Sequence, residues 1–177
     1  MHSAMTWWFT GLPGAGKTTL AQAWAAEIRH GERPALVLDG DELRQGLSRD
    51  LGFSHADRAE NMRRVAEVAR LLNDAGVNVM VALVSPTLLG RKTAREIIGT
   101  SRFLEVFVST PLLVCQQRDP KGLYRRAASN EQFELTGVQA PYEIPTDADL
   151  VIDTSQTPLP QALVMLSTTW RAPRPDL

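Results

Sequence analysis

The sequence predicts an α/β fold in which helices cover both faces of a five-stranded, mostly parallel sheet, a three-layer α/β/α arrangement. Two observations support this prediction. Short apolar runs alternate with helix-period segments along the chain, which is typical of consecutive βα units. The 177 residues fit a single domain spanning 1–177, and a content of 44% hydrophobic and 22% charged residues is ordinary for a globular protein.

The expected elements follow from these runs in chain order. The strands are expected at residues 7–10, 35–38, 77–84, 103–108 and 150–152, and the helices at 17–30, 41–50, 56–75, 88–98, 111–118 and 158–169. In parallel sheets of this type, ligands bind beyond the carboxyl ends of the strands, so residues that directly follow a strand are the first candidates for function. The only long irregular stretch, at about 119–148, is expected to be a functional loop.

Composition and charge exclude several classes of function. The net charge of -1 gives no broad basic field, so a nucleic-acid partner is not expected. No apolar run reaches the 18 residues or more that a membrane span requires, and no leader pattern opens the chain, so we expect a cytoplasmic protein without a membrane partner. The single Cys115 cannot form an internal disulfide and is expected to be a buried structural thiol.

The strongest motif follows the first expected strand. Residues 11–18 read Gly-Leu-Pro-Gly-Ala-Gly-Lys-Thr and match G-x-x-x-x-G-K-[ST], with apolar residues before and an alanine-rich helix after. In this P-loop, Lys17 bridges the β- and γ-phosphates and Thr18 ligates Mg²⁺. The motif therefore predicts a P-loop NTPase fold that binds ATP or GTP. The expected nucleotide-binding residues are Gly11, Leu12, Pro13, Gly14, Ala15, Gly16, Lys17, Thr18 and Thr19.

Two carboxylates, Asp39 and Asp41, stand at the end of the second expected strand. A P-loop kinase needs an acid near the phosphates, either to hold Mg²⁺ through water or to accept the proton of the acceptor hydroxyl. Asp41 is the candidate base, and Asp39 or Asp41 is the candidate for the water-mediated magnesium contact. The chain has no Asn-Lys-x-Asp guanine-reading sequence and no strand ending in Asp-Glu, which disfavours a GTP switch or a motor ATPase.

The helix expected at 56–75 carries polar residues on its core side. At 100° per residue, Arg58 and Asn61 fall on the same side as the apolar Met62, whereas Arg63 and Arg70 fall on the opposite, solvated side. An inward arginine is costly unless an anion pairs with it, so Arg58 is expected to meet a substrate phosphate or sulfate.

A second basic group lies in and before the irregular stretch. Arg118, Lys121, Arg125 and Arg126 fall within nine positions and can neutralise the charge that develops during phosphoryl transfer. The alternative interpretation is a solvated basic turn.

Together, these and later motifs resemble the adenylylsulfate (APS) kinase family from about Trp7 to Ile152. The quoted motifs are residues 11–18, Asp39-Gly-Asp41 with Arg44, Phe53-Ser54 with Asp57-Arg58, residues 60–64, Ser85-Pro86, residues 103–107, Thr110-Pro111-Leu112 with Cys115, residues 118–124, Thr136-Gly137 and Pro141-Tyr-Glu143. The resemblance implies transfer of the γ-phosphoryl group of MgATP to the 3′-hydroxyl of adenylylsulfate, a small-molecule nucleotide acceptor.

The resemblance also implies roles for individual residues. Asp41 is then the base, and the acceptor-binding residues are Asp41, Arg44, Phe53, Arg58, Asn61, Val84, Ser85 and Leu135. Arg44, Arg58 and Asn61 hold the phosphosulfate end, and Phe53 stacks on the substrate adenine. Arg118 and the loop that carries Lys121, Arg125 and Arg126 cover the ATP side as a basic lid.

The departures from the family pattern lie on the acceptor side. Glu42 stands where Asn is expected, Thr87 and Leu88 where an aromatic residue and Arg are expected, and Leu135 where Phe is expected. Because a stacked aromatic contributes about 1–3 kcal/mol per base, Leu135 favours a weaker adenine site or another base.

These departures leave alternatives open. One is a kinase that acts on the ribose hydroxyl of another nucleotide conjugate, such as a cytidine diphosphoramidate used in surface polysaccharide synthesis. Another is a regulatory nucleotide-binding protein without transfer, which the intact Lys17, Thr18 and Asp41 disfavour. The family's usual N-terminal extension, which bears on dimer contacts, has no counterpart before residue 7. The oligomeric state is therefore left open, with a homodimer as one alternative.

Overall fold

The strands form one parallel sheet in the computed structural model, which describes residues 4–129 and 134–171. The strands are β1 (Thr6–Thr10), β2 (Ala35–Asp39), β3 (Asn78–Ala82), β4 (Phe103–Val108) and β5 (Leu150–Ile152). Their order is β2-β3-β1-β4-β5, and every pairing between these described strands is parallel. The predicted five-stranded α/β sheet is confirmed.

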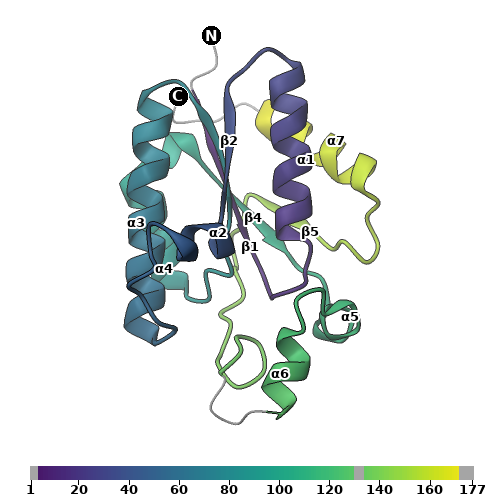
Figure 1. Cartoon of the computed structure of the whole chain (residues 1–177). Helices are drawn as coiled ribbons and strands as arrows, with labels where there is room; N and C mark the ends of the chain where they lie inside the picture. Colours follow the sequence, from purple (N-terminus) through teal and green to yellow (C-terminus); the bar gives the residue numbers. More distant parts are fainter. Residues whose placement is uncertain (1–3, 130–133, 172–177) are drawn as a thin grey trace.

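Helices cover both faces of this sheet (Figure 1). The helices α1 (Lys17–His30) and α7 (Leu159–Arg171) lie on one face, and α3 (His55–Asp74) and α4 (Leu88–Ile98) lie on the other. One apolar core contains side chains from α1 and α7, and a second contains side chains from α3 and α4. The predicted three-layer arrangement is therefore confirmed.

The central strand β1 is buried on both faces, as its continuous apolar sequence requires. The ring of Trp7 meets Trp24 edge to face, with centroids 5.7 Å apart, and meets Trp170 in the same way at 5.5 Å. The next residue, Trp8, points to the opposite face, where its ring lies 5.7 Å from that of Phe103. This packing on both sides fixes the carboxyl end of β1, where the P-loop begins, in the middle of the sheet.

The helix expected at residues 41–50 is wrong at its carboxyl end. Helix α2 (Gly40–Gln45) is short, and the amides of Gly46 and Ser48 both donate to the carbonyl of Leu43, at 3.2 and 2.9 Å. The chain therefore turns after Gln45 instead of continuing the helix. The end of β3 also differs from the expected 77–84, because the strand stops at Ala82.

The stretch at 119–148 is not irregular throughout. Within it lies the short helix α6 (Leu123–Ser129), which a turn separates from the preceding helix α5 (Leu112–Arg118). Outside this stretch, the 3₁₀ helix η1 (Thr100–Arg102) precedes β4. The carboxylate of Asp119 accepts from the amides of Tyr124 and Arg125, both at 3.1 Å, which satisfies free donors at the start of α6. Cys115 of α5 is fully buried, as expected of a structural thiol.

Two segments, the lid and the strap, lie at the carboxyl edge of the sheet. The lid comprises residues 119–129, and the strap comprises residues 134–149, which return the chain from the lid to β5. Figure 1 shows α5, α6 and the first part of the strap together below the carboxyl ends of the strands.

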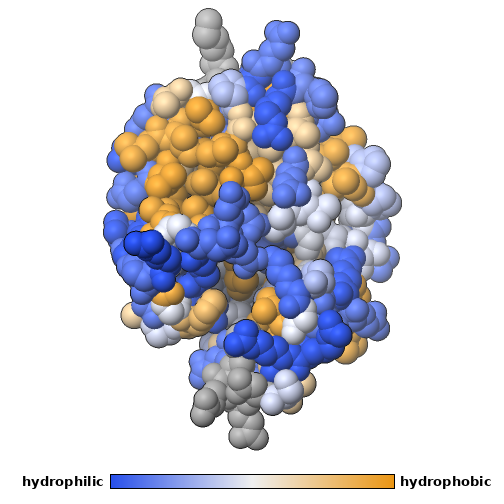
Figure 2. All heavy atoms as spheres, in the orientation of Figure 1, coloured by the Kyte–Doolittle hydropathy of each residue, from blue (hydrophilic) through white to orange (hydrophobic). Residues whose placement is uncertain are grey.

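The surface is unevenly divided between apolar and polar residues. Figure 2 shows apolar side chains gathered in the upper half of the view and hydrophilic ones around the lower half, where the lid lies. Within residues 4–129 and 134–171, no helix has the length and hydropathy that a membrane span requires.

Candidate active site

The P-loop connects β1 to α1 and has the geometry that the motif predicts. At Gly11 the backbone passes so close to β4 that an added Cβ would lie 2.5 Å from the carbonyl oxygen of Val108, and φ is +148°, so only glycine fits. The ammonium group of Lys17 donates to the carbonyls of Gly11 and Leu12, at 2.9 and 2.8 Å. Burial lowers the pKa of Lys17 from 10.5 to about 8.

The first residues of α1 meet the end of β2. The hydroxyl of Thr18 donates to Asp39 Oδ2 at 2.6 Å, and Asp39 Oδ1 accepts from the amide of Asp41 at 2.9 Å. Asp39 is therefore the N-cap of α2 and also a neighbour of the P-loop helix. Thr19 is exposed one position further along α1.

These oxygens fit a magnesium ion. Mg²⁺ takes oxygen ligands and is usually held by one or two protein groups together with substrate phosphates and water. The Thr18 hydroxyl and the Asp39 carboxylate supply such a pair. The described residues contain no cluster of three or more His, Cys, Asp or Glu side chains that could hold a metal by themselves.

Arg118 at the end of α5 lies beside the P-loop. Its two Nη atoms donate to Thr154, one to Oγ1 at 2.7 Å and one to the carbonyl at 3.1 Å. The Thr154 hydroxyl in turn donates to the carbonyl of Ala15 at 2.8 Å, and Thr110 Oγ1 donates to the same carbonyl at 3.0 Å. Thr154 was missed in the sequence, although its place two residues after β5 is the kind of signal that could have identified it.

The three basic residues of the lid lie in two different surroundings. Lys121 forms an ion pair with the carboxylate of Asp41, the candidate base. The side chain of Arg125 is 85% exposed and lies 3.6 Å from Asp119, and Arg126 is exposed on α6. The structure therefore places Lys121 at the carboxylate of the candidate base and leaves Arg125 and Arg126 on the outer face of the lid.

Two arginines surround an exposed aromatic ring on the acceptor side. The ring of Phe53 is 57% exposed, with the guanidinium carbon of Arg44 at 4.3 Å and that of Arg58 at 5.5 Å from its centroid. Main-chain carbonyls hold both arginines: Arg44 donates to Gly52 at 2.8 Å, and Arg58 Nε donates to Phe53 at 2.9 Å. Burial lowers the pKa of Arg58, and the neighbouring positive charge of Arg44 lowers it further.

Of the remaining predicted acceptor residues, Asn61, Ser85 and Leu135 are buried and Val84 is partly buried. Asn61 is 5% exposed, and its Oδ1 has no hydrogen-bond partner among the described residues. Ser85 is 2% exposed and accepts a hydrogen bond from Trp8 Nε1 at 2.8 Å, next to Val84, whose carbonyl accepts from Thr10. Leu135 is 5% exposed and belongs to the apolar core rather than to an open wall.

The sequence-based interpretation of α3 agrees with the observed side chains. Ser54 is the N-cap, and its Oγ accepts from the amide of Asp57 at 3.1 Å. Arg63, expected on the solvated side, pairs with Glu60 at 2.8 Å and is 49% exposed. Arg58 is half-buried one turn earlier, as expected for a residue turned toward the site.

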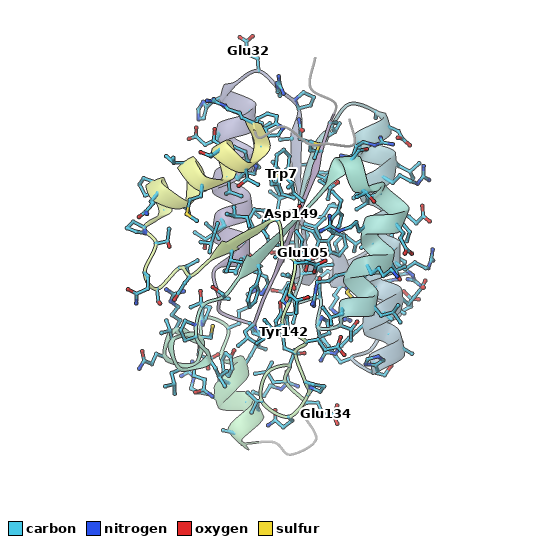
Figure 3. All side chains as sticks on the ribbon, turned by 180° about the vertical axis from the view of Figure 1, so that it is seen from behind. Trp7, Glu32, Glu105, Glu134, Tyr142 and Asp149 are labelled. Carbon is cyan, nitrogen blue, oxygen red and sulfur yellow. The ribbon has the colours of Figure 1, made fainter. Side chains whose placement is uncertain are left out.

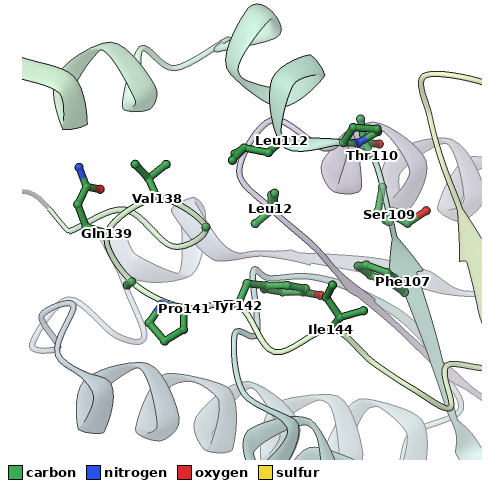
Figure 4. A pocket seen from close by; sticks show the side chains of 14 residues that line it. Leu12, Phe107, Ser109, Thr110, Leu112, Val138, Gln139, Pro141, Tyr142 and Ile144 are labelled. Carbon is green, nitrogen blue, oxygen red and sulfur yellow. The ribbon is translucent and has the colours of Figure 1, made fainter.

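A cavity of about 630 Å³ lies behind the P-loop, between the end of β4 and the strap. Figure 4 shows Phe107 and Tyr142, whose rings stack with centroids 6.0 Å apart, on one side and Leu112 on the other. Only Leu12 among the fourteen lining residues belongs to the predicted site. This cavity is therefore separate from the carboxylates and arginines described above.

Comparison with known proteins places this arrangement in one family. The family model described as "Adenylylsulphate kinase" matches residues 3–153. An adenylyl-sulfate kinase of Shewanella amazonensis is 50% identical over 165 residues, which cover 93% of this chain and 83% of that protein. One of Erwinia tasmaniensis is 48% identical over 155 residues, covering 88% of this chain and 77% of that protein.

A solved structure of similar fold supports the same placement. The APS kinase CysC of Mycobacterium tuberculosis, solved in complex with AMPPNP and APS, superposes with a TM-score of 0.92. It is 40% identical, and the match covers 97% of this chain and all of that chain. With a family model over most of the chain and relatives near half identity, the chain belongs to the adenylylsulfate kinase family.

Proposed function

We propose that this protein is an adenylylsulfate kinase that transfers the γ-phosphoryl group of ATP to the 3′-hydroxyl of adenylylsulfate, giving ADP and 3′-phosphoadenylylsulfate. The observation that carries the acceptor assignment is the exposed ring of Phe53 with the guanidinium groups of Arg44 and Arg58 beside it. An exposed aromatic ring suits a purine base, and two cations suit the phosphosulfate group attached to it. The named function of relatives near half identity agrees with this assignment.

On the nucleotide side, we assign Lys17 and the P-loop amides to the β- and γ-phosphates. Lys17 is buried against carbonyls of its own loop, so its ammonium group lies where the phosphates would pass. When bound, Mg²⁺ neutralises charge on the β- and γ-phosphates, with Thr18 as a ligand and Asp39 as the partner through water. Arg118, held by Thr154, borders the same nucleotide on its other side.

Between the nucleotide-binding residues and the acceptor-binding residues, Asp41 orients the acceptor hydroxyl and takes its proton. The carboxylate lies in the first turn of α2, where the amide of Asp41 is already bound by Asp39, so its backbone is fixed. Lys121 of the lid contacts this carboxylate and thereby stands where the acceptor hydroxyl and the γ-phosphate meet. Lys121 is the lid residue that we assign to charge neutralisation during transfer.

The acceptor is tested by measuring ADP release from MgATP with a panel of nucleotides. The panel contains adenylylsulfate, a CDP-linked and a UDP-linked conjugate, and a blank without acceptor. We expect turnover with micromolar adenylylsulfate and no more than the blank rate with the other conjugates. Turnover restricted to a pyrimidine conjugate would contradict the proposal, and tight ATP binding without turnover on any acceptor would indicate a regulatory protein.

A further inference from the structure

The Pro141-Tyr-Glu143 motif of the strap has no part in the proposed chemistry, yet Glu143 is tied to the acceptor side by three contacts. Its amide donates to the carbonyl of Pro86 at 2.8 Å. Its carboxylate accepts from the amide of Leu88 at 2.5 Å, at the first residue of α4. Its carbonyl accepts from Arg91 Nη2 at 2.6 Å. One residue of the strap thus binds the segment that leads from β3 into α4.

Arg91 completes this connection from the other side. The side chain is 2% exposed, and Nη1 donates to the carbonyl of Ser85 at 2.6 Å while Nη2 reaches Glu143. Nε lies 2.8 Å from the carboxylate of the buried Glu105 in β4. The planar guanidinium therefore bridges Ser85 and Glu143, with its charge matched by a carboxylate beneath the strap. Figure 3 shows Glu105 and Tyr142 one above the other in this region, seen from behind.

Ser85 needs such support because its backbone is in an unfavourable region. Its φ is +49°, a left-handed conformation that residues with a Cβ rarely adopt. The conformation persists only where surrounding contacts determine it. Those contacts are the hydrogen bond from Trp8 to Oγ and two hydrogen bonds to the carbonyl, from Arg91 at 2.6 Å and from Thr10 Oγ1 at 3.3 Å.

The other end of the strap touches both halves of the site. The backbone of Gly137 lies against Leu12 of the P-loop, so that an added Cβ would be 2.5 Å from a methyl carbon of that leucine. The carbonyl of Glu134 accepts from Arg58 at 3.4 Å. The contacts that restrain the strap at Glu143 therefore also restrain the carbonyl that Arg58 binds, in addition to Ser85.

We infer that Glu143 and Arg91 are positioning residues for the acceptor: together they clip the strap to residues 84–88 and hold Ser85 in its left-handed conformation at the acceptor pocket. This inference rests on the proposed function, because it takes Ser85 and Arg58 as parts of the adenylylsulfate site. Neither positioning residue touches the P-loop lysine or the carboxylates of β2 and α2. The strap meets the P-loop by packing of Gly137 on Leu12, whereas it is hydrogen-bonded to Arg58 and to the segment after β3. We therefore expect the clip to affect acceptor binding more strongly than ATP binding.

The test compares Glu143→Ala and Glu143→Gln with wild type, using Glu96→Ala as the matched control. Glu96 lies on α4, the helix whose first residue Glu143 binds, but its side chain is 64% exposed and pairs with Lys92 at 3.9 Å. Wild-type turnover with adenylylsulfate is measured first, followed by KM for adenylylsulfate, KM for MgATP and Tm for each variant. We expect the adenylylsulfate KM to rise about tenfold in Glu143→Ala and less in Glu143→Gln, which keeps a hydrogen-bond acceptor. The MgATP KM should stay within twofold.

Arg91→Lys provides a second variant that keeps the buried charge beside Glu105. A lysine cannot bridge two carbonyls as the planar guanidinium does, so its adenylylsulfate KM should also rise about tenfold. Equal rises in both KM values together with a lower Tm would reveal general destabilisation and overturn the inference. So would an adenylylsulfate KM within twofold of wild type in Glu143→Ala.

Hydrogen exchange keeps the clip testable independently of turnover. In Glu143→Ala, but not in Glu96→Ala, the amides of residues 84–91 should exchange about tenfold faster, because Leu88 has lost its acceptor. If the amides of residues 84–91 exchanged at the wild-type rate in Glu143→Ala, the inference about the clip would be overturned, whatever the measured activity. Absence of wild-type turnover with adenylylsulfate, by contrast, would overturn the proposed function.

Discussion

The nucleotide half and the acceptor half of the site are built in different ways. In the nucleotide half, Lys17 and Ala15 are buried, and the contacts run to carbonyl oxygens of the P-loop itself. In the acceptor half, the ring of Phe53 is 57% exposed, and the arginines beside it are held across short loops. One half is a folded piece of backbone, whereas the other is a set of side chains brought together from several segments.

This difference teaches where specificity can change. A P-loop tolerates little variation, because its glycines are needed for close backbone contacts, as at Gly11. The acceptor half depends on single side chains from α2, from α3 and the loop before it, from the segment after β3, and from the strap. The departures from the family pattern, at Glu42, Thr87, Leu88 and Leu135, are all predicted for that half.

The largest effect is expected at Asp41, where the two halves meet. Asp41→Asn removes the base and should lower kcat by about 10²- to 10⁴-fold, while the Kd for MgATP stays within twofold. Steady-state ADP release and calorimetric titration with MgATP measure the two quantities. Asp74→Asn, at the far end of α3, is the control and should leave both unchanged. If Asp41→Asn kept most of its rate, Asp39 would become the better candidate base.

A smaller effect should be confined to the acceptor half. Arg58→Ala removes a charged donor beside Phe53, and the loss of a charge-assisted hydrogen bond, about 1.5–3 kcal/mol, should raise the adenylylsulfate KM by about ten- to a hundredfold. The Kd for MgATP should not change. Arg63→Ala, on the solvated side of the same helix, should behave like wild type. A large loss of ATP affinity in Arg58→Ala would move this arginine out of the acceptor half.

The burial of the nucleotide half should appear in the pH dependence of stability. Lys17 has a pKa of about 8 in the folded protein against 10.5 when unfolded, so the unfolded chain binds more protons between these values. The contribution of Lys17 to the free energy of unfolding is therefore lowest below pH 8 and rises with pH up to about 10.5. Relative to Lys17→Met, the free energy of unfolding of wild type should rise by about 2 kcal/mol between pH 7 and pH 9.5.

Chemical denaturation at several pH values measures this difference, and other titrating groups cancel in the comparison with Lys17→Met. A difference that does not change with pH would mean that Lys17 is fully hydrated in the folded protein. That outcome would remove the contrast between the buried lysine of the nucleotide half and the exposed Phe53 of the acceptor half.

The smallest effect is expected at Leu135, which is 5% exposed. If its side chain contributes to the adenine site, Leu135→Phe should lower the adenylylsulfate KM about fivefold, near the lower end of the 1–3 kcal/mol for stacking. Its Tm should fall by a few degrees, because an added ring overpacks the core. A lower Tm with an unchanged KM would identify Leu135 as a core residue alone. Parallel thermal melts and kinetics decide between these outcomes.

Much of the fold could be predicted because its signals are local. The alternation of apolar runs and helix-period segments predicted the strands and helices, and the motif at residues 11–18 predicted the nucleotide site. The errors in the predicted helices lie where contacts outside the helical period determine where a helix begins or ends. Helix α2 ends at Gln45 because two amides share the carbonyl of Leu43, and α6 begins where Asp119 caps it within a stretch expected to be irregular.

The sequence by itself determined the fold class, the P-loop and the facing of Arg58, because each follows from the order of neighbouring residues and the period of a helix or strand. The tertiary structure alone decided that Lys121 meets Asp41, that Arg118 meets Thr154 and that Glu143 binds the first residue of α4. These pairs are separated by 80, 36 and 55 positions, so no local pattern specifies them. They form because parallel strands bring their carboxyl ends to one edge of the sheet, where loops distant in sequence come within hydrogen-bonding distance.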